Sequence, residues 1–430
     1  MQDENLNDSP SRASASGSDE KYSEFTDQID IYTLHELHAG RLILDPLEAK
    51  KELGDSVAAK LKLTKDGRYV LWPQPTDDPE DPQNWSDRKK NFQLFIVILA
   101  SIIPDFDNGI GIISTFPLSK QFHTTPGVIN NISSKWPPHL GWGGIFFVML
   151  MRRYGRLATL FWTQLIALGL LAGATFAPTL QVFAAMRSLT AFFGTCPQVT
   201  GLYTITDLFP FHLQARKINY WTMAVVLSPH LSPFLFGFLD ARTTWRWAYG
   251  VGCLYGLAVL ILIALFLDES LYHRKAYSAD HPPVHRRKGS IVQRVKDVVG
   301  ITGVRQARSD PPWSDICTAI LKIAWRPHLF LILFFEAFVF GFSIGINVTI
   351  TVFFQTPPPF GFGFSQTTVS AIYATPVVAV FIGELLGRYL NDWFMRREIK
   401  RNNGVFEAET RLWYLHLLLY WQFPAAYILN

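Results

Sequence analysis

From about residue 91 onward, long apolar blocks alternate with short polar connections along the chain. Most of these blocks are close to the ~20 apolar residues that a helix needs to cross ~30 Å of hydrocarbon. The pattern therefore predicts an all-α, polytopic membrane protein and not a soluble fold. We predict membrane-spanning helices at 91–117, 127–151, 157–178, 181–206, 219–240, 246–268, 328–354, 367–391 and 412–430.

The spacing of these helices divides the chain into four parts. Residues 1–90 are polar and rich in Ser, Asp, Glu and Pro, which predicts a disordered cytoplasmic tail. A bundle of six helices follows at 91–268, and the basic, hydrophilic insert at 269–327 is predicted to be a cytoplasmic loop. This insert is either a solvated linker or a surface whose cations contact anionic lipid headgroups. Residues 328–430 are predicted to form a partial second bundle of three helices.

The composition agrees with helices that are solvated by lipid. The chain of 430 residues is 49% hydrophobic and only 17% charged, and its 34 Phe and 13 Trp are more than one soluble core buries. Its three cysteines are too few and too scattered for a disulfide framework or a zinc site. Cys196 and Cys253 lie inside apolar blocks, where a thiol acts as a small hydrophobic group.

Lys and Arg cluster on every second connection between the predicted helices. Cations precede the first helix and follow the second, fourth, sixth and eighth, whereas the opposite connections are poor in them apart from Arg242 and Arg246. Short loops rich in Lys and Arg stay in the cytoplasm, so the pattern places the N-terminus there. Asn131, in the sequon Asn131-Ile-Ser133, then lies on the outer side and is a candidate glycosylation site.

Few ionisable residues lie inside the predicted helices, and two of them are close together in the first. A charge near the bilayer centre costs ~2.5–3.5 kcal/mol, so such residues usually face a cavity or a partner. Asp105 and Asp107 are two positions apart, which keeps them off a common helix face, and Pro104 and Gly109 flank them. Two interpretations remain open for these aspartates: binding of protons or substrate, and hydrogen bonding between helices.

Further polar positions occur in the fourth, fifth and seventh predicted helices. Arg187 and Gln198 lie on a stripe of small and polar residues, which is either a close helix contact or one wall of a central substrate cavity. Glu336 and Asn347, on or near one face of the seventh helix, would form a second wall. The fifth helix contains two prolines four residues apart, which remove two backbone hydrogen bonds and predict a bend.

No enzymatic motif accompanies these polar positions. The sequence contains no Gly-x-x-x-x-Gly-Lys-Ser/Thr phosphate loop, no His-Glu-x-x-His, no Cys-x-x-Cys and no Gly-x-Ser-x-Gly pattern. The glycines of Gly361–Ser365 are predicted to form a short loop, because no strand precedes them. We therefore expect neither an enzyme nor a cofactor or metal.

Several segments resemble the major facilitator superfamily, and in particular its fungal drug:proton-antiporter-like branch. Residues 78–86 (DPEDPQNWS) resemble the lead-in to the first helix of that branch, and residues 207–216 (DLFPFHLQAR) resemble its loop between helices four and five. Residues 361–365 (GFGFS) and 383–392 (GELLGRYLND) resemble the turn before helix eight and the cytoplasmic end of that helix. Together the segments span about residues 78–415.

The resemblance implies two six-helix bundles around a central cavity and transport by rocking between two open states. It also implies proton-coupled export of a small organic molecule, such as a drug or a fungal secondary metabolite. By this resemblance the gating loops and helix bends are formed by Arg153, Gly155, Arg156, Asp207, Arg216, Pro229, Pro233, Gly237 and Asp392. Arg152 stands where the family has Asp, which predicts altered gating.

The family has twelve helices, whereas this chain reaches Asn430 in the ninth predicted one. The alternative to an exporter is therefore a truncated, transport-inactive relative or a membrane sensor. Otherwise we expect a monomer with a small-molecule substrate, protons and the lipid bilayer as its partners, and no nucleic acid. The plasma membrane is the expected location, with a vacuolar or other internal membrane as the alternative.

Overall fold

A computed structural model describes residues 41–134, 136–272, 274, 291–307, 312–402 and 405–407 of the chain. The chain divides into two compact units. The larger consists of Asp78–His273 with Pro282–Leu390, and the smaller of Met1–Asp77 with Arg274–His281 and Asn391–Asn430. The ninth predicted helix, 412–430, lies outside the described residues.

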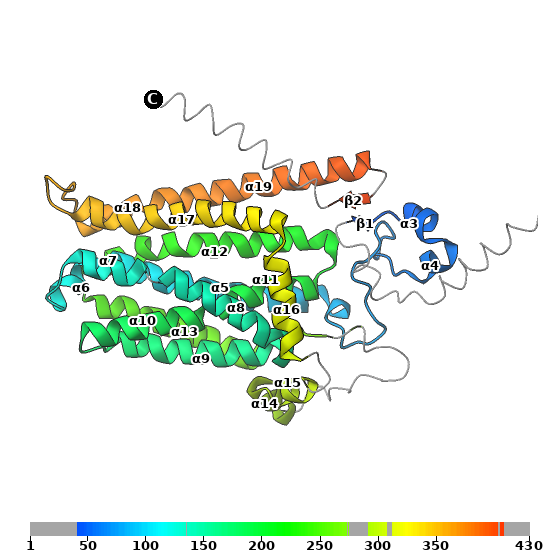
Figure 1. Cartoon of the computed structure of the whole chain (residues 1–430), viewed down its shortest axis with the longest axis horizontal. Helices are drawn as coiled ribbons and strands as arrows, with labels where there is room; N and C mark the ends of the chain where they lie inside the picture. The colour runs from blue at the N-terminus through cyan, green and yellow to red at the C-terminus, as the bar shows by residue number, and fades with distance from the viewer. Residues whose placement is uncertain are drawn as a thin grey trace, which may run out of the picture. The chain divides into compact units, whose positions relative to one another are not determined.

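The larger unit is a bundle of long helices (Figure 1). A short 3₁₀-helix, η1 (Pro82–Asn84), precedes them. The helices that follow are α5 (Asp87–Ile113), α6 (Thr115–Gln121), α7 (Pro126–Ser134), α8 (Trp136–Tyr154), α9 (Arg156–Thr175), α10 (Leu180–Gly194), α11 (Cys196–Leu208), α12 (Phe211–Asp240), α13 (Trp245–Phe266), α14 (Ile291–Val299), α15 (Ile301–Gln306), α16 (Trp313–Ala324), α17 (Pro327–Gln355), α18 (Gln366–Ile372) and α19 (Ala374–Arg401), whose last part belongs to the smaller unit.

Six helical stretches among the described residues are long and apolar enough to span a membrane, which confirms the predicted polytopic helical fold. They are Asp87–Ile113, Arg156–Thr175, Phe211–Asp240, Trp245–Phe266, Leu329–Gln355 and Gln366–Arg401. The second predicted span corresponds to α7 and α8, on either side of residue 135, which lies outside the described residues. The fourth is a second case of two helices, because it is divided between α10 and α11. Pro197, in the first turn of α11, has no N–H group to donate back to α10, which explains this division.

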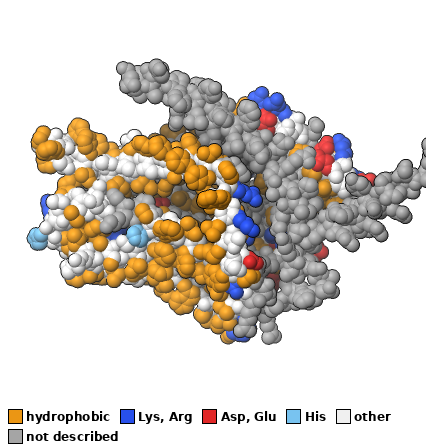
Figure 2. Space-filling view, viewed as in Figure 1, with side chains coloured by type: hydrophobic (Ala, Val, Ile, Leu, Met, Phe, Trp, Pro, Cys, Tyr) orange, Lys and Arg blue, Asp and Glu red, His pale blue; other side chains and the backbone are white. Residues whose placement is uncertain are grey.

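Helix α5 lies at the centre of this bundle. It packs against α10, α11, α12 and α13, and 78% of its most apolar stretch is buried. Ile96, Ile110 and Ile113 are fully buried on it. Helix α17 is the opposite case, because none of its most apolar stretch is buried and most of its phenylalanines are exposed. Hydrophobic side chains cover much of the bundle surface in Figure 2, as lipid-facing helices require.

Residues outside the long helices also form local structure. In the smaller unit, the three-residue strands β1 (Arg41–Ile43) and β2 (Val405–Glu407) pair antiparallel, beside the short helices α3 (Pro46–Leu53) and α4 (Asp55–Lys60). The described residues of the predicted tail therefore include a strand and two short helices. In the larger unit, α14, α15 and α16 occupy part of the insert that we predicted as a loop or linker.

Candidate functional site

The two aspartates of α5 meet different neighbouring helices. Gln198 on α11 donates a hydrogen bond from Nε2 to Asp105 Oδ2 at 2.6 Å. Asp107 lies on the side of α5 where α10 and α13 supply its neighbours, and only 2% of it is exposed. This separation follows from the helical turn of ~100° per residue, which puts positions two apart on nearly opposite sides.

Asp107 lies next to a buried arginine. The Arg187 guanidinium donates from Nη1 to the backbone carbonyl of Asp107 at 3.0 Å, and its Cζ is 5.5 Å from the centre of the Tyr249 ring. The Oδ1 atom of Asp107 accepts no hydrogen bond from any residue that the structure describes. An acid and a base therefore meet in the apolar interior of the bundle, where charge interactions are strong.

Two glycines make room for these polar groups. A Cβ on Gly111 would lie 2.8 Å from Arg187 Nη2, and a Cβ on Gly252 would lie 3.2 Å from Asp107 Oδ1. Larger side chains at either position would push the charged groups away from α5. The close approach of α5, α10 and α13 thus depends on small residues, as is typical of helix packing in membranes.

Other polar side chains that the sequence did not single out lie around α5. Trp221 on α12 donates from Nε1 to Ser101 Oγ at 2.9 Å. Asn108 and Ser232 are buried, and their side-chain oxygens have no hydrogen-bond partner among the described residues. The sequence offered one signal for each of these buried residues: Asn108 directly follows Asp107, and Ser232 directly precedes Pro233.

The proline pair of α12 creates two free backbone acceptors. Pro229 and Pro233 lack the N–H groups that would bond the carbonyls of Val225 and Pro229, although α12 continues through both. Ser228 Oγ donates to the Val225 carbonyl at 2.8 Å, and Asn347 Nδ2 on α17 donates to the Pro229 carbonyl at 3.4 Å. One freed carbonyl is thus satisfied within the helix and the other by α17.

The two polar positions predicted on α17 differ in their surroundings. Asn347 is buried, and its backbone carbonyl accepts a 2.8 Å hydrogen bond from the Tyr373 hydroxyl group. Glu336 is exposed, and the structure does not bring it to Asp107. Eleven positions separate Glu336 from Asn347, which is about three helical turns or ~16 Å along the axis of α17.

The predicted gating residues gather where α9 begins and α11 ends. Gly155 has a φ of +92°, a conformation that favours glycine, and it turns the chain into α9. Arg156 forms an ion pair with Asp207. Glu269 accepts hydrogen bonds from the backbone N–H groups of Arg156 and Leu157, each at 3.0 Å. The carboxylate therefore caps the positive end of α9.

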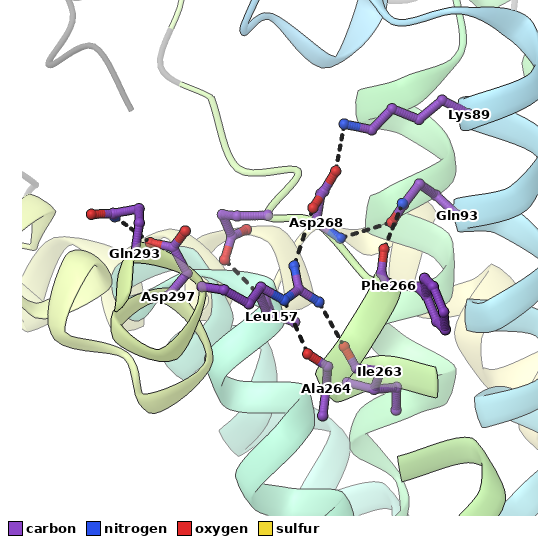
Figure 3. A network of polar contacts seen from close by, with 11 residues as sticks. Lys89, Gln93, Leu157, Ile263, Ala264, Phe266, Asp268, Gln293 and Asp297 are labelled. Carbon is purple, nitrogen blue, oxygen red and sulfur yellow. Dashed lines mark hydrogen bonds and ion pairs between the residues drawn. The ribbon is translucent and has the colours of Figure 1, made fainter. Parts of the chain in front are cut away.

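Asp268, the neighbour of Glu269, is the centre of a second set of contacts (Figure 3). It forms ion pairs with Lys89 at the start of α5 and with Arg294 on α14. Gln93 donates to the Phe266 carbonyl and accepts from the Asp268 N–H group, each at 2.9 Å. The starts of α5 and α9 and the ends of α11 and α13 therefore meet at one end of the bundle.

The remaining predicted gating residues are spread over other elements. Arg153 lies in the last turn of α8, with Cζ 5.6 Å from the centre of the Trp313 ring. Arg216 lies near the start of α12, and Asp392 lies in α19. Gly237 marks a contact with α18, since a Cβ there would lie 1.6 Å from Ser370 Oγ.

Glu269→Gln is expected to destabilise the protein by about 1–3 kcal/mol, because the amide can accept at only one of its two terminal atoms. Thermal unfolding in detergent would measure the loss. The matched control is Glu398→Gln, whose carboxylate pairs with Arg401 in an exposed ion pair and should contribute less than about 1 kcal/mol. Equal effects of the two variants would contradict the capping role.

The arrangement defines a helical integral membrane protein with buried charges between its spanning helices. The sequence model of the Major Facilitator Superfamily matches residues 94–406. The chain belongs to this superfamily. Because the superfamily consists of transporters, this membership agrees with the prediction that the chain is not an enzyme.

Two named transporters and one solved structure are also similar to this chain. The MFS transporter fsa7 of a Fusarium species is 22% identical over 88% of this chain and 71% of its own length. The efflux pump radE of Floropilus chiversii is 25% identical over 90% of this chain and 69% of its own length. A bacterial homologue of the human lysosomal transporter Spinster, solved in an inward-facing and unoccupied conformation, superposes with a TM-score of 0.49 and 16% identity. That match covers 73% of this chain but only 64% of the other, which is less than two thirds.

Proposed function

We propose that this protein is a secondary transporter that exports a small organic molecule in exchange for protons. The observation that carries the proposal is the buried pair of Asp107 and Arg187 between spanning helices. Ionisable groups at such depth are costly and are typical of proton and substrate pathways. The names of two relatives, an efflux pump and an MFS transporter, support export and transport respectively.

The geometry supports a simple coupling scheme. With Asp107 ionised, its negative charge holds the Arg187 guanidinium close to α5. Uptake of a proton by Asp107 removes that attraction, so Arg187 becomes available to an anionic or polar group of the substrate. Proton binding and substrate binding then change the charge of the same site, which is the physical requirement for coupling one flux to the other.

Purified protein in liposomes would test the function, with ethidium as a cationic probe and fluorescein as an anionic probe. We expect accumulation of at least one probe under an imposed pH gradient, and its loss when a protonophore is added. Accumulation that ignores the protonophore would remove the proton coupling. Failure of both probes to move faster than in protein-free liposomes would argue against export of charged organic molecules.

We further propose a monomer in the plasma membrane with its N-terminus in the cytoplasm, as the cation pattern favours. The end of the bundle with Lys89, Arg156 and Arg294 would then face the cytoplasm. Asn131, exposed on α7, would face outward. We expect endoglycosidase to increase the gel mobility of the wild-type protein expressed in a eukaryotic membrane, and to leave Asn131→Gln unchanged. A shift that persists in the variant would contradict this topology.

A further inference from the structure

Helix α14 and the short α15 carry exposed apolar side chains, here called the apolar row, that no described residue covers. Six side chains are between 42% and 82% exposed, and they are Ile291, Val292, Val295, Val299, Ile301 and Val304. Within α14 the four exposed residues fall within ~100° of the helix circumference. Six exposed apolar side chains in fifteen residues are not typical of a water-solvated linker.

Another side of α14 contacts the membrane-spanning helices. Arg294 donates to the carbonyls of Ile263 and Ala264, each at 3.0 Å, and forms an ion pair with Asp268 at 3.1 Å (Figure 3). Both carbonyls belong to the last turn of α13, and that of Ile263 also accepts a hydrogen bond from the Leu267 N–H group at 3.3 Å. Arg294 thereby attaches α14 to the end of a spanning helix.

A second contact fixes the depth of α14. Trp162 donates from Nε1 to the Val299 carbonyl at 3.2 Å. Trp162 is six residues into α9, or about 9 Å along its axis. Helix α15 lies close to the end of α8, because a Cβ on Gly303 would come within 1.9 Å of the Tyr154 carbonyl oxygen. Both short helices therefore lie level with the ends of spanning helices, where hydrocarbon gives way to headgroups.

The apolar row continues the exposed surface of the neighbouring helices. Trp162, Leu165 and Ile166 are exposed on α9, and Leu265 and Phe266 are exposed at the end of α13. These spanning helices have their exposed apolar side chains in lipid. An apolar row that is fixed beside them at the membrane boundary faces the same medium.

Charge complementarity identifies the kind of lipid. Lys296 and Arg305 border the apolar row. The negative charge of Asp297 is turned toward the helices themselves, since its Oδ1 accepts hydrogen bonds from Thr302 at 2.6 Å and Gln293 at 2.9 Å. An apolar row bordered by cations is the usual signature of a helix in the headgroup region of an anionic leaflet.

We propose that α14 and α15 form a lipid-binding surface that lies in the headgroup region of an anionic membrane leaflet. This proposal is independent of the transport function, because it concerns only where the surface lies. It also assigns Arg294 a role, which is to hold the amphipathic helix against α13.

Spin labels on the full-length protein test the proposal, after Cys196, Cys253 and Cys317 have been replaced. One label is placed at Val295 in the apolar row, and a matched control label is placed at the adjacent Lys296. In phosphatidylcholine–phosphatidylglycerol vesicles, we expect oxygen to collide with the first label more than a water-soluble nickel complex does, and the reverse for the second. A label at Val292 repeats the test if Val295→Cys fails to fold.

The other outcomes overturn the proposal. A label at Val295 that the nickel complex reaches freely would show a water-exposed linker. A label shielded from both reagents would show a protein contact, such as a second copy of this chain. We also expect the oxygen accessibility at Val295 to fall when phosphatidylglycerol is replaced by phosphatidylcholine, and no change would remove the anionic part of the proposal.

Discussion

Replacing Asp107 by Asn will abolish proton-driven transport while leaving the bundle folded. The amide has nearly the same shape as the carboxylate, and the hydrogen bond from Arg187 goes to the backbone carbonyl, which the substitution keeps. Only the titratable charge is lost. We expect uptake driven by a pH gradient to fall at least about tenfold, which corresponds to ~1.4 kcal/mol of lost coupling. Exchange between equal substrate concentrations on both sides, which needs no net proton movement, should persist.

Asp105→Asn is the matched control for this prediction. The acid it removes is two residues away in the same helix, and the Asn side chain can still accept the hydrogen bond from Gln198. We expect proton-driven uptake to remain within about threefold of wild type, since the substitution keeps the acceptor for Gln198 and leaves Asp107 in place. Equal losses in both variants would contradict the assignment of coupling to Asp107, as would normal uptake by Asp107→Asn.

Replacing Gly237 by Ala will disrupt the contact between α12 and α18. The new Cβ would lie 1.6 Å from Ser370 Oγ, 2.7 Å from Ser370 Cβ and 3.0 Å from Ile113 Cγ1, so the helices must move apart. Overpacking of this kind costs about 1–3 kcal/mol. We expect a lower thermal unfolding temperature and slower transport.

Gly250→Ala provides the control, because a Cβ on Gly250 in α13 would meet no heavy atom within 4 Å. Alanine favours helices over glycine by about 0.8–1 kcal/mol, so this variant should be neutral or more stable. Adding Ser370→Gly to Gly237→Ala removes both clashing atoms of Ser370 and should restore most of the stability. A Gly237→Ala protein as stable as Gly250→Ala would show that the contact tolerates a methyl group.

Much of the fold follows from the sequence because lipid imposes a length and a polarity on each spanning helix. Asp107 and Arg187 could be found in the same way, since charged residues are rare in apolar blocks. The two lie together in the structure, as do Asp105 and Gln198.

Other parts of the site could not be predicted, because they depend on how each helix is rotated against its neighbours. Glu336 is as unusual in its apolar block as Asp107, yet α17 leaves it exposed. Trp221 and Ser101 gave no signal, since Trp is common in spanning helices and a serine can bond its own helix, as Ser101 does with the Val97 carbonyl at 2.8 Å. The breaks between α10 and α11 at Thr195 and between α18 and α19 at Tyr373 could not be predicted from the length of an apolar block. Two short helices in line are as apolar as one long helix.

In α12, the residue that makes a contact with α17 is not the residue that decides whether this contact can form. Asn347 touches Pro229, but the oxygen it reaches is available only because Pro233, one turn further on, cannot donate to it. Alanine at 229 would leave that acceptor in place, whereas alanine at 233 would supply a competing N–H from within the helix. A comparison of natural variants that considers only positions 347 and 229 would therefore overlook Pro233, whose identity decides whether the hydrogen bond between Asn347 and Pro229 can form.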